Sequence, residues 1–471
     1  MGFGGGLYTE ENKILPGSYY KYKSAGTNVS TYAERGLVGL IAPSDWSDGT
    51  LMRLVVPEKE FDHKGAYVWP RDAEKAIGYD AYTALPASYS AGTNDAKWLP
   101  IFVRETFRNA TGCFIYPLLG STKAKASCTY ATAAKYGERG NDLSVKIDEN
   151  DDETFTVYTL LDGEAVDTQT VTTYADLVDN AWAAFDKETE LAASAATVFT
   201  GGVSGTATAA DVATAIETLG NFGVNVIVPL TSLMDKAAYE VFLDQNNKYG
   251  HWMQLICDKD AAWLPEGGHE YCIAPDLGAD NSLVNVELLY PWIGGAEAAC
   301  PLGGTLDNET YSGEIIDFLI NTQGLKAPKQ SELEYGMRAG YMMLHTVGTE
   351  WRVLNDDNTF IAYTPKKDES FHRNQTIRVL QTLSVDWNQI FTNEFLGSAG
   401  TDEADRTNYK IRLVESATYY QKQRAIKNFD SADIVVTEGA QSDSYRVSYF
   451  VQPNFCVRKV YNEITVAAFN S

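Results

Sequence analysis

The chain has 471 residues, and since a domain takes ~150 residues on average, we expect roughly three domains rather than one small module. Lysine and arginine number 38 against 63 aspartate and glutamate residues, which gives a net charge of −25 with histidine neutral. This balance argues against binding nucleic acid directly, because phosphate contacts need clustered lysine and arginine. Hydrophobic residues at 44% and aromatic residues at 12% are values of a globular protein and exclude wholesale disorder.

Targeting signals and cysteines indicate where the chain folds. It has no apolar stretch of about 18 residues that could cross a bilayer, and Met1–Gly6 lacks the basic-then-apolar order of a secretory signal. We therefore expect folding in the cytoplasm and no stable membrane insertion. Six cysteines without a CxxC pair predict free, mostly buried thiols rather than a disulfide framework: Cys113, Cys128, Cys257, Cys272, Cys300 and Cys456.

The first part of the chain, residues 1–32, is predicted to be an arm. Glycines at positions 2, 4, 5 and 6 leave its start flexible, and Ile14–Lys23 reads as a short extended run with alternating Tyr20 and Tyr22. Its apolar positions are too few to form a core. The strand must therefore add to a sheet elsewhere in this chain or in another one.

Residues 33–111 and 112–200 differ in their patterns. The first region is a mixed α+β segment, with strands predicted over Gly36–Ala42 and Met52–Val56 and a helix over Trp98–Arg108. In the second, apolar and polar residues alternate over 143–147 and 155–159, and the Asp162-Gly163 pair is a hairpin signal. We expect a β-sandwich there, with the acidic run 148–153 in a loop.

Residues 201–364 alternate between helix and strand patterns after the glycine-rich junction Thr200–Thr206. We expect Asp211 to cap a helix whose apolar residues recur through Leu219. A strand over Val224–Val228, a helix over Lys236–Lys248 and a strand over Met253–Cys257 follow. This order predicts an α/β domain with some parallel sheet.

Residues 365–471 begin with the clearest helix, whose apolar residues recur at three and four positions from Ile377 to Phe391. A second helix is predicted over Tyr409–Tyr420. Alternation then predicts a strand over Tyr445–Val451 and a last strand over Val460–Val466, which forms a second terminal arm.

Catalytic and nucleotide motifs are missing from the sequence. The nearest approach to a Gly-x-Ser-x-Gly elbow is around Ser204, without the final glycine, and no phosphate-binding glycine loop follows a strand. His269 and Cys272, with Cys257 as a conceivable third ligand, lack the two close pairs typical of zinc sites. We expect no catalytic residue, no cofactor and no metal ligand.

The acidic loop near Asp151 copies the first three positions of a calcium loop. Position six is Glu153 instead of glycine and position twelve is Thr159 instead of glutamate, so the loop lacks the turn and the closing ligand of that motif. A solvated charged loop is the favoured interpretation.

Four stretches carry a resemblance to a known family: Gly2–Tyr19; Ala134–Asp142 with the following Leu160–Gly163 and Val166–Val171; Phe371–Leu380; and Val451–Val466. In family order and spread over nearly the whole chain, they resemble tail sheath proteins of contractile-tailed bacteriophages and phage-tail-like particles. The resemblance implies an α+β multidomain fold, with a peripheral β-sandwich, a subtilisin-like but non-proteolytic α/β domain and an α+β C-terminal domain.

The resemblance also implies a function. Subunits would stack as hexameric rings around a tail tube and shorten on a trigger, which drives the tube through a bacterial envelope. The implied partners are the chain itself, the tail tube protein, and baseplate and tail terminator proteins. The implied location is the virion tail or a phage-tail-like particle, assembled in the cytoplasm of the bacterial host.

In this family the terminal arms cross to neighbouring subunits and complete their sheets, and the resemblance places this strand exchange on both arms. From the sequence alone, ordinary pairing within one chain is an equal alternative. A subtilisin-like or glycosidase-like hydrolase and a tail tube subunit are the competing classes, although tube subunits are usually much shorter. The implied exchange residues are Leu15, Ser18, Tyr19, Tyr20, Lys21, Val460, Tyr461, Ile464, Thr465, Val466 and Ala467.

Overall fold

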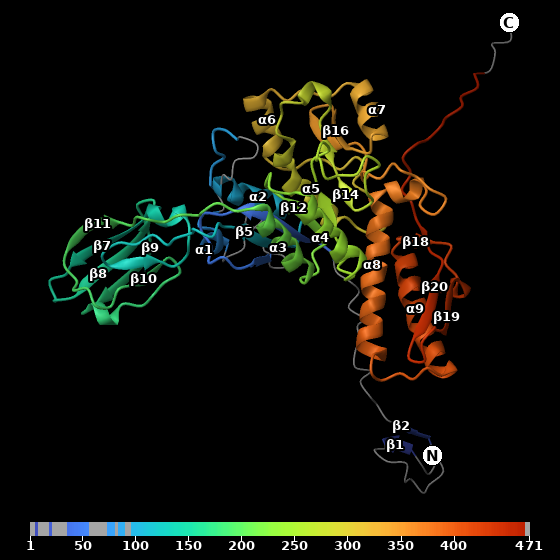
Figure 1. Cartoon of the computed structure of the whole chain (residues 1–471), viewed down its shortest axis with the longest axis horizontal. Coiled ribbons are helices and arrows are strands. Elements are labelled where there is room, and N and C mark those ends of the chain that lie inside the picture. Colours follow the sequence, from blue (N-terminus) through green and yellow to red (C-terminus); the bar gives the residue numbers. More distant parts are fainter. Residues whose placement is uncertain are drawn as a thin grey trace.

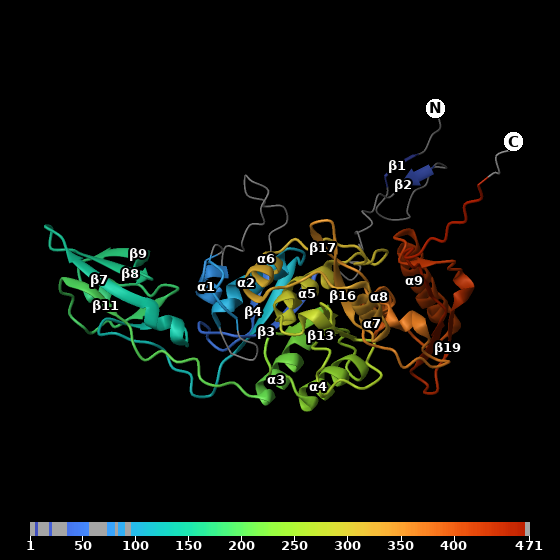
Figure 2. The ribbon, with the colours of Figure 1, turned by 90° about the horizontal axis from the view of Figure 1, so that it is seen from above.

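The structure is a computed structural model, and it describes residues 5–7, 18–20, 35–55, 73–80, 83–89 and 96–466. Three bodies lie in a row, with a β-sandwich at one end, an α/β body in the middle and a helical pair at the other end (Figures 1 and 2). The expectation of a multidomain α+β fold with a β-sandwich is confirmed.

The middle body is built on a six-stranded sheet in the order β14-β13-β12-β3-β5-β4. All neighbours pair in parallel except β4, which is antiparallel to β5. The apolar residues of β12, and those of β3 after the half-buried Leu37, are buried, as expected for parallel strands with helices on both faces. The strands are β3 (Leu37–Pro43), β4 (Met52–Val55), β5 (Gly112–Leu118), β12 (Val226–Pro229), β13 (Gln254–Ile256) and β14 (Cys272–Ile273).

Helices cover the two faces of this sheet, and the alternating side chains of β3 divide between them. Val38 and Leu40 pack with α2 and α5, whereas Ile41 packs with α3 and α4. Gly294 in α5 lets the helix approach closely, since a Cβ there would lie 2.4 Å from Val228. The helices are α2 (Leu99–Phe107), α3 (Ala209–Gly220), α4 (Lys236–Asn247) and α5 (Tyr290–Ala299).

A second, smaller layer stands beside the sheet. Its three strands are ordered β15-β16-β17, with β16 and β17 forming a hairpin. The sequence patterns do not anticipate this layer. It comprises α6 (Ile315–Gln323), α7 (Gln330–Arg338), β15 (Pro275–Asp276), β16 (Met342–Val347) and β17 (Glu350–Val353).

The β-sandwich has a four-stranded sheet in the order β11-β7-β8-β9 and a two-stranded sheet of β6 and β10. Asp162 and Gly163 both have positive φ, at 51° and 87°, so the predicted hairpin turn between β8 and β9 is confirmed. The strands are β6 (Ala131–Ala133), β7 (Leu143–Glu149), β8 (Phe155–Leu161), β9 (Glu164–Val171), β10 (Ala183–Phe185) and β11 (Ser194–Val198).

The sandwich is docked on the middle body through the loop after β3 and the short helix α1 (Ala73–Ile77). Trp46 from that loop is buried in the core of the sandwich, 5.4 Å from the ring of Trp182. Arg139 of the sandwich donates to the carbonyl of Gly78 at 2.8 Å. This joint gives the sandwich a defined orientation in the subunit.

The C-terminal body is a pair of helices beside short strands. The predicted apolar face of α8 is confirmed, since Ile377, Leu383, Trp387 and Ile390 are buried. Trp387 also donates its indole N–H to Ser416 of α9 at 3.2 Å. The elements are α8 (Asn374–Ile390), a π-helical turn (Phe391–Phe395), α9 (Glu403–Lys422), β18 (Ile426–Lys427), β19 (Ile434–Glu438), β20 (Tyr445–Tyr449) and β21 (Gln452–Pro453).

Two segments distant in sequence share the middle sheet, because β3, β4 and β5 precede the sandwich and β12, β13 and β14 follow it. The sandwich is thus an insertion between β5 and β12. Its two connections run side by side, with the amide of Gly120 donating to the carbonyl of Ser204 at 2.9 Å. The exact boundaries of the five regions defined from the sequence (1–32, 33–111, 112–200, 201–364 and 365–471) stay predictions.

One local expectation is wrong. Asp211 does not cap α3; Thr208 does, and Asp211 accepts from the Thr208 amide at 2.7 Å as the other half of a capping box. Val460–Val466 pairs with no described strand of its own chain, so the predicted strand in this arm stays a prediction.

The prediction for the cysteines is confirmed. All six lie in the described part of the chain and are free thiols, and four of them are buried. Separately, none of the described helices is long and apolar enough to cross a membrane.

Candidate functional site

The C-terminal segment leaves the folded body as an extended chain (Figure 1). Its apolar side chains lie in solvent: Val460 is 73% exposed, Tyr461 89%, Ile464 84% and Val466 84%. A cluster of large exposed apolar side chains in one segment is unusual for a monomeric protein and marks an interaction site. We call residues 459–466 the C-terminal arm.

The sheet of β19 and β20 has open edges in the described part of the chain, because neither strand has a second strand partner there. One face of this sheet is apolar and packs on the helical pair: Ile434 is buried, and Tyr449 stacks on Trp387 with 4.1 Å between ring centroids. An open edge next to an apolar face can accept another strand.

The N-terminal segment contains two short strands, β1 (Gly5–Leu7) and β2 (Ser18–Tyr20), which pair in parallel. Ser18, Tyr19 and Tyr20 therefore lie in a strand, within the extended run that the sequence predicts, but their partner in the single chain is β1. The sequence patterns do not anticipate β1. Leu15, Lys21 and Ala467 lie outside the described residues.

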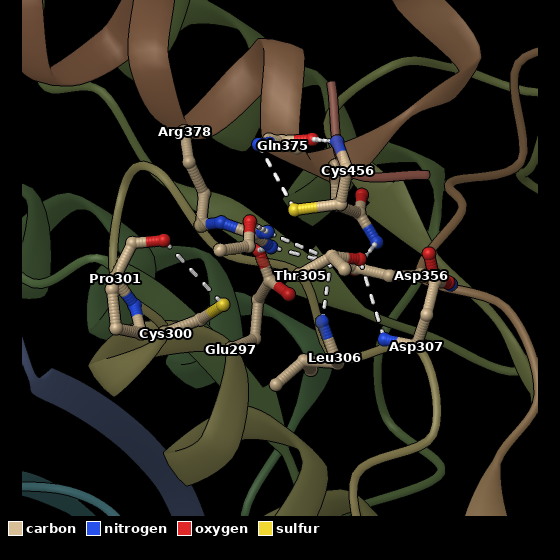
Figure 3. A network of polar contacts seen from close by, with 12 residues as sticks. Glu297, Cys300, Pro301, Thr305, Leu306, Asp307, Asp356, Gln375, Arg378 and Cys456 are labelled. Atoms are coloured by element: carbon tan, nitrogen blue, oxygen red, sulfur yellow. Dashed lines mark hydrogen bonds and ion pairs between the residues drawn. The ribbon is translucent and has the colours of Figure 1, made fainter. Parts of the chain in front are cut away.

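A buried ion network joins the C-terminal body to the middle body (Figure 3). Arg378 of α8 donates to Glu297 of α5 at 2.5 Å and to Asp356, after β17, at 2.7 Å. All three side chains have no exposed area. Because an unpaired charge is costly in such a place, this network fixes α8 against α5 and the loop after β17.

The pKa values of the two carboxylates in this network shift in opposite directions. Burial raises the pKa of Glu297 to about 7, although the charge of Arg378 opposes the shift. Burial also acts to raise the pKa of Asp356, but the charge and hydrogen bonds of Arg378, together with those from Leu306 and Asn374, hold it well below its usual range. Asp356 is therefore the permanent anion of the network.

Sequence reasoning missed this network, although a signal for it exists. Asn374, Gln375, Arg378 and Gln381 recur at helical spacing within α8 and are all buried. Helix α8 has an apolar face and an exposed face, and these polar residues form a third line along it. Such a line of polar residues indicates a buried polar contact with another element.

Open α/β sheets bind ligands at the carboxyl ends of their strands, so a hydrolase would hold its substrate at the ends of β12, β13 and β15. A cavity of about 710 Å3 lies there. Lys259 on its wall is paired with Asp276 at 2.7 Å, and further carboxylates, among them Asp258 and Glu287, also line the cavity. Ser204 lies elsewhere, in the connection to the sandwich, where its hydroxyl accepts from the amide of Glu138 at 3.4 Å.

The side chains that could have bound a metal make hydrogen bonds within the protein. The ring of His269 accepts from the amide of Tyr271 at 3.2 Å, and Cys257 hydrogen-bonds Cys272. In the acidic loop, Asp152 accepts from the amide and hydroxyl of Thr154 at 3.3 and 2.6 Å. No cluster of three or more histidine, cysteine or carboxylate side chains that could hold a metal occurs among the residues that the structure describes.

These features define a multidomain α+β protein whose apolar terminal segment lacks a partner in the single chain, as in the subunit of an assembly. Comparison with known proteins agrees. Residues 120–211 match the family model of the phage tail sheath protein beta-sandwich domain, and residues 366–467 match that of the phage tail sheath C-terminal domain. The two matched domains together support a phage tail sheath protein.

Similar proteins match over nearly the whole chain. The phage-like element PBSX protein XkdK of Bacillus subtilis is 22% identical, with 98% of this chain and 99% of the relative covered. The sheath tail protein of Desulfitobacterium hafniense has a TM-score of 0.72 at 24% identity, covering 93% of this chain and 96% of that one. For the sheath tail protein Lin1278 of Listeria innocua the TM-score is 0.67 at 22% identity, with 90% and 92% covered. The two structures support the fold.

Proposed function

We propose that the chain polymerises as stacked hexameric rings around a tail tube and that this sheath contracts to drive the tube through a bacterial envelope. The observation that carries the proposal is the C-terminal arm, whose apolar side chains are 73–89% exposed at Val460, Tyr461, Ile464 and Val466. The likeness of two domains to those of phage tail sheath proteins supports the proposal of rings around a tube that contract.

The C-terminal arm would add as a strand to the open β19–β20 sheet of a neighbouring subunit. Eight residues in strand geometry span about 26 Å, which is long enough to cross to another subunit. In such a strand Val460, Ile464 and Val466 share one face and can extend the apolar face around Ile434. Tyr461 and Thr465 then point to the other side, and backbone hydrogen bonds supply the adhesion.

The N-terminal arm would make a second exchange through Leu15–Lys21. In the single chain its central residues pair with β1 over three residues. An isolated two-stranded pair of this length is marginal in water, so an edge in a neighbouring subunit can compete for the strand.

Contraction requires no cofactor if the contracted lattice buries more surface than the extended one. Apolar burial stabilises by ~25 cal/mol per Å2, and the gain accumulates over many subunits when one ring after another changes state. We propose that the middle body, with its mostly parallel sheet, is the subtilisin-like domain. The proposed partners are the tube protein, baseplate and tail terminator, with assembly in the host cytoplasm.

A matched pair of variants tests the exchange. Ile464→Asp places a charge on the face that would pack against the neighbour, whereas Thr465→Asp adds the same charge at the adjacent, outward position. Negative-stain electron microscopy of the purified proteins should show ribbed tubes for Thr465→Asp and none for Ile464→Asp, with equal melting temperatures. Tubes formed equally well by both variants would refute exchange through this arm.

A further inference from the structure

The C-terminal arm begins at a densely bonded root, residues 454–458. The amide of Asn454 donates to Ala425 O at 3.0 Å, and the amide of Cys456 donates to Gln375 Oε1 at 3.4 Å. Arg458 donates both Nε and Nη2 to Asp307, at 2.5 and 2.8 Å, and Nη1 to Asp357 at 2.7 Å. Such a bidentate, charge-assisted pair is strong and fixes direction.

The root ends abruptly after Arg458. Arg458 itself is largely covered, with 18% of its side chain exposed. Two residues later the side chain of Val460 is 73% exposed, and no described residue from 459 to 466 makes a hydrogen bond or ion pair with the body. The point where the arm can swing therefore lies directly after Arg458.

The N-terminal arm has a root of the same kind just before β3. Arg35 donates to the carbonyl of Glu297 at 3.3 Å and to the hydroxyl of Thr382 at 3.5 Å. The amides of Gly36 and Leu37 both donate to Asn225 Oδ1, at 2.9 and 3.0 Å. This root is thus held by α5 and α8, the helices that Arg378 joins.

The two roots meet at the buried network. Arg35 contacts the backbone of Glu297, whose carboxylate binds Arg378, which in turn binds Asp356. Arg458 donates to the backbone carbonyl of Asp356 at 3.2 Å. A continuous series of ion pairs and hydrogen bonds therefore runs from one arm root to the other, and its central side chains are fully buried.

We propose that the Arg378 network is a junction that transmits force between the two arms of a subunit. A pull on one arm by a neighbour is passed through Arg35, Glu297, Arg378, Asp356 and Arg458 to the other arm. The body between the arms then moves as one block. This inference rests on the proposed function, because it gives the arms neighbours to bind.

Hydrogen exchange on the dilute full-length monomer, isolated by gel filtration, tests the coupling. The variants are Arg458→Gln and Arg35→Gln, with Arg412→Gln as the control, because Arg412 makes an exposed ion pair with Glu394 away from both roots. Each root variant should speed exchange about tenfold at its own root. It should also speed exchange about threefold at the opposite root, by similar factors in both directions because coupling is reciprocal.

The result that would overturn the proposal is loosening confined to the substituted root, with the opposite root exchanging as in the wild type or in Arg412→Gln. If Arg458→Gln also loses protection in the sandwich, its fold has failed and Asp307→Asn replaces it, since it weakens the same clasp. The proposed function fails by a different result, which is the formation of tubes by Ile464→Asp. That result does not depend on the hydrogen-exchange rates of the monomer.

Discussion

Asp45 is a buried carboxylate at the joint between the sandwich and the middle body. Its Oδ2 accepts from the hydroxyl of Tyr79 at 2.5 Å, while its Oδ1 is buried without a hydrogen-bond partner among the described residues. Burial raises the pKa of Asp45 to about 6, against the opposing effects of Tyr79 and Arg139. The folded state thus holds this proton more tightly than the unfolded state does.

The expected consequence is a pH-dependent joint. The protonated form contributes stability that is complete below pH ~4 and is lost as the pH rises through ~6, by up to about 3 kcal/mol. Asp45→Asn should remove this dependence because asparagine is neutral throughout. Urea unfolding of both proteins between pH 4 and 7 measures it: the free energy of the wild type relative to Asp45→Asn should fall with rising pH. A constant or rising difference would contradict this.

Arg378 is expected to be the most sensitive single position in the C-terminal half of the fold. Arg378→Met leaves Glu297 and Asp356 buried without their cation, which should cost about 3–5 kcal/mol. The triple variant Arg378→Met, Glu297→Gln, Asp356→Asn should recover much of that loss, because the two carboxylates no longer carry buried charges. Urea unfolding of the single and triple variants tests this; equal destabilisation in both would show that shape rather than charge sets the cost.

At the scale of elements, the strongly amphipathic pieces were predictable. In α8 and β8 most of the apolar residues follow one period and face one neighbour, so sequence pattern and burial coincide. Helix α5 was not predictable in this way, because nine of its ten residues, from Tyr290 to Ala298, are buried and no polar face marks the period. The strands β6 and β10 have three residues each, too few to establish a pattern.

The candidate site was predictable in part for the same reason. The apolar alternation of Val460–Val466 is local and visible in the sequence, but whether it pairs within the chain depends on distant sheet edges. The Arg378 network is assembled from α5, α8 and the loop after β17, so its partners are separated by up to 81 residues in sequence. The periodicity of a sequence cannot predict contacts between residues so far apart.

Helix α9 should support the acceptor sheet through its buried face. Leu413→Ala removes a fully buried side chain and should cost about 2–5 kcal/mol. Ile411→Ala, in the same helix but 49% exposed, should cost less than about 1 kcal/mol. The melting temperatures of the two variants check this difference; similar melting temperatures would mean that α9 does not pack in solution as it does here.

At the scale of the whole molecule, three packed bodies are followed by a C-terminal arm whose apolar side chains are exposed. The sandwich is fixed by Trp46 and Arg139, and the C-terminal body by Arg378. Deletion of residues 1–22 should therefore leave the melting temperature unchanged but abolish ordered tubes, since the N-terminal arm serves the lattice rather than the body. Ordered tubes from the truncated chain, seen by electron microscopy, would contradict this role.

The most direct test of the central claim is a cryo-electron microscopy map of the assembled tubes, at a resolution that traces the backbone. The account predicts that Val460–Val466 of one subunit lies beside β19 or β20 of a neighbour, with its main chain hydrogen-bonded to that strand. A map in which this segment folds back on its own subunit, with no neighbouring chain in contact, would contradict it.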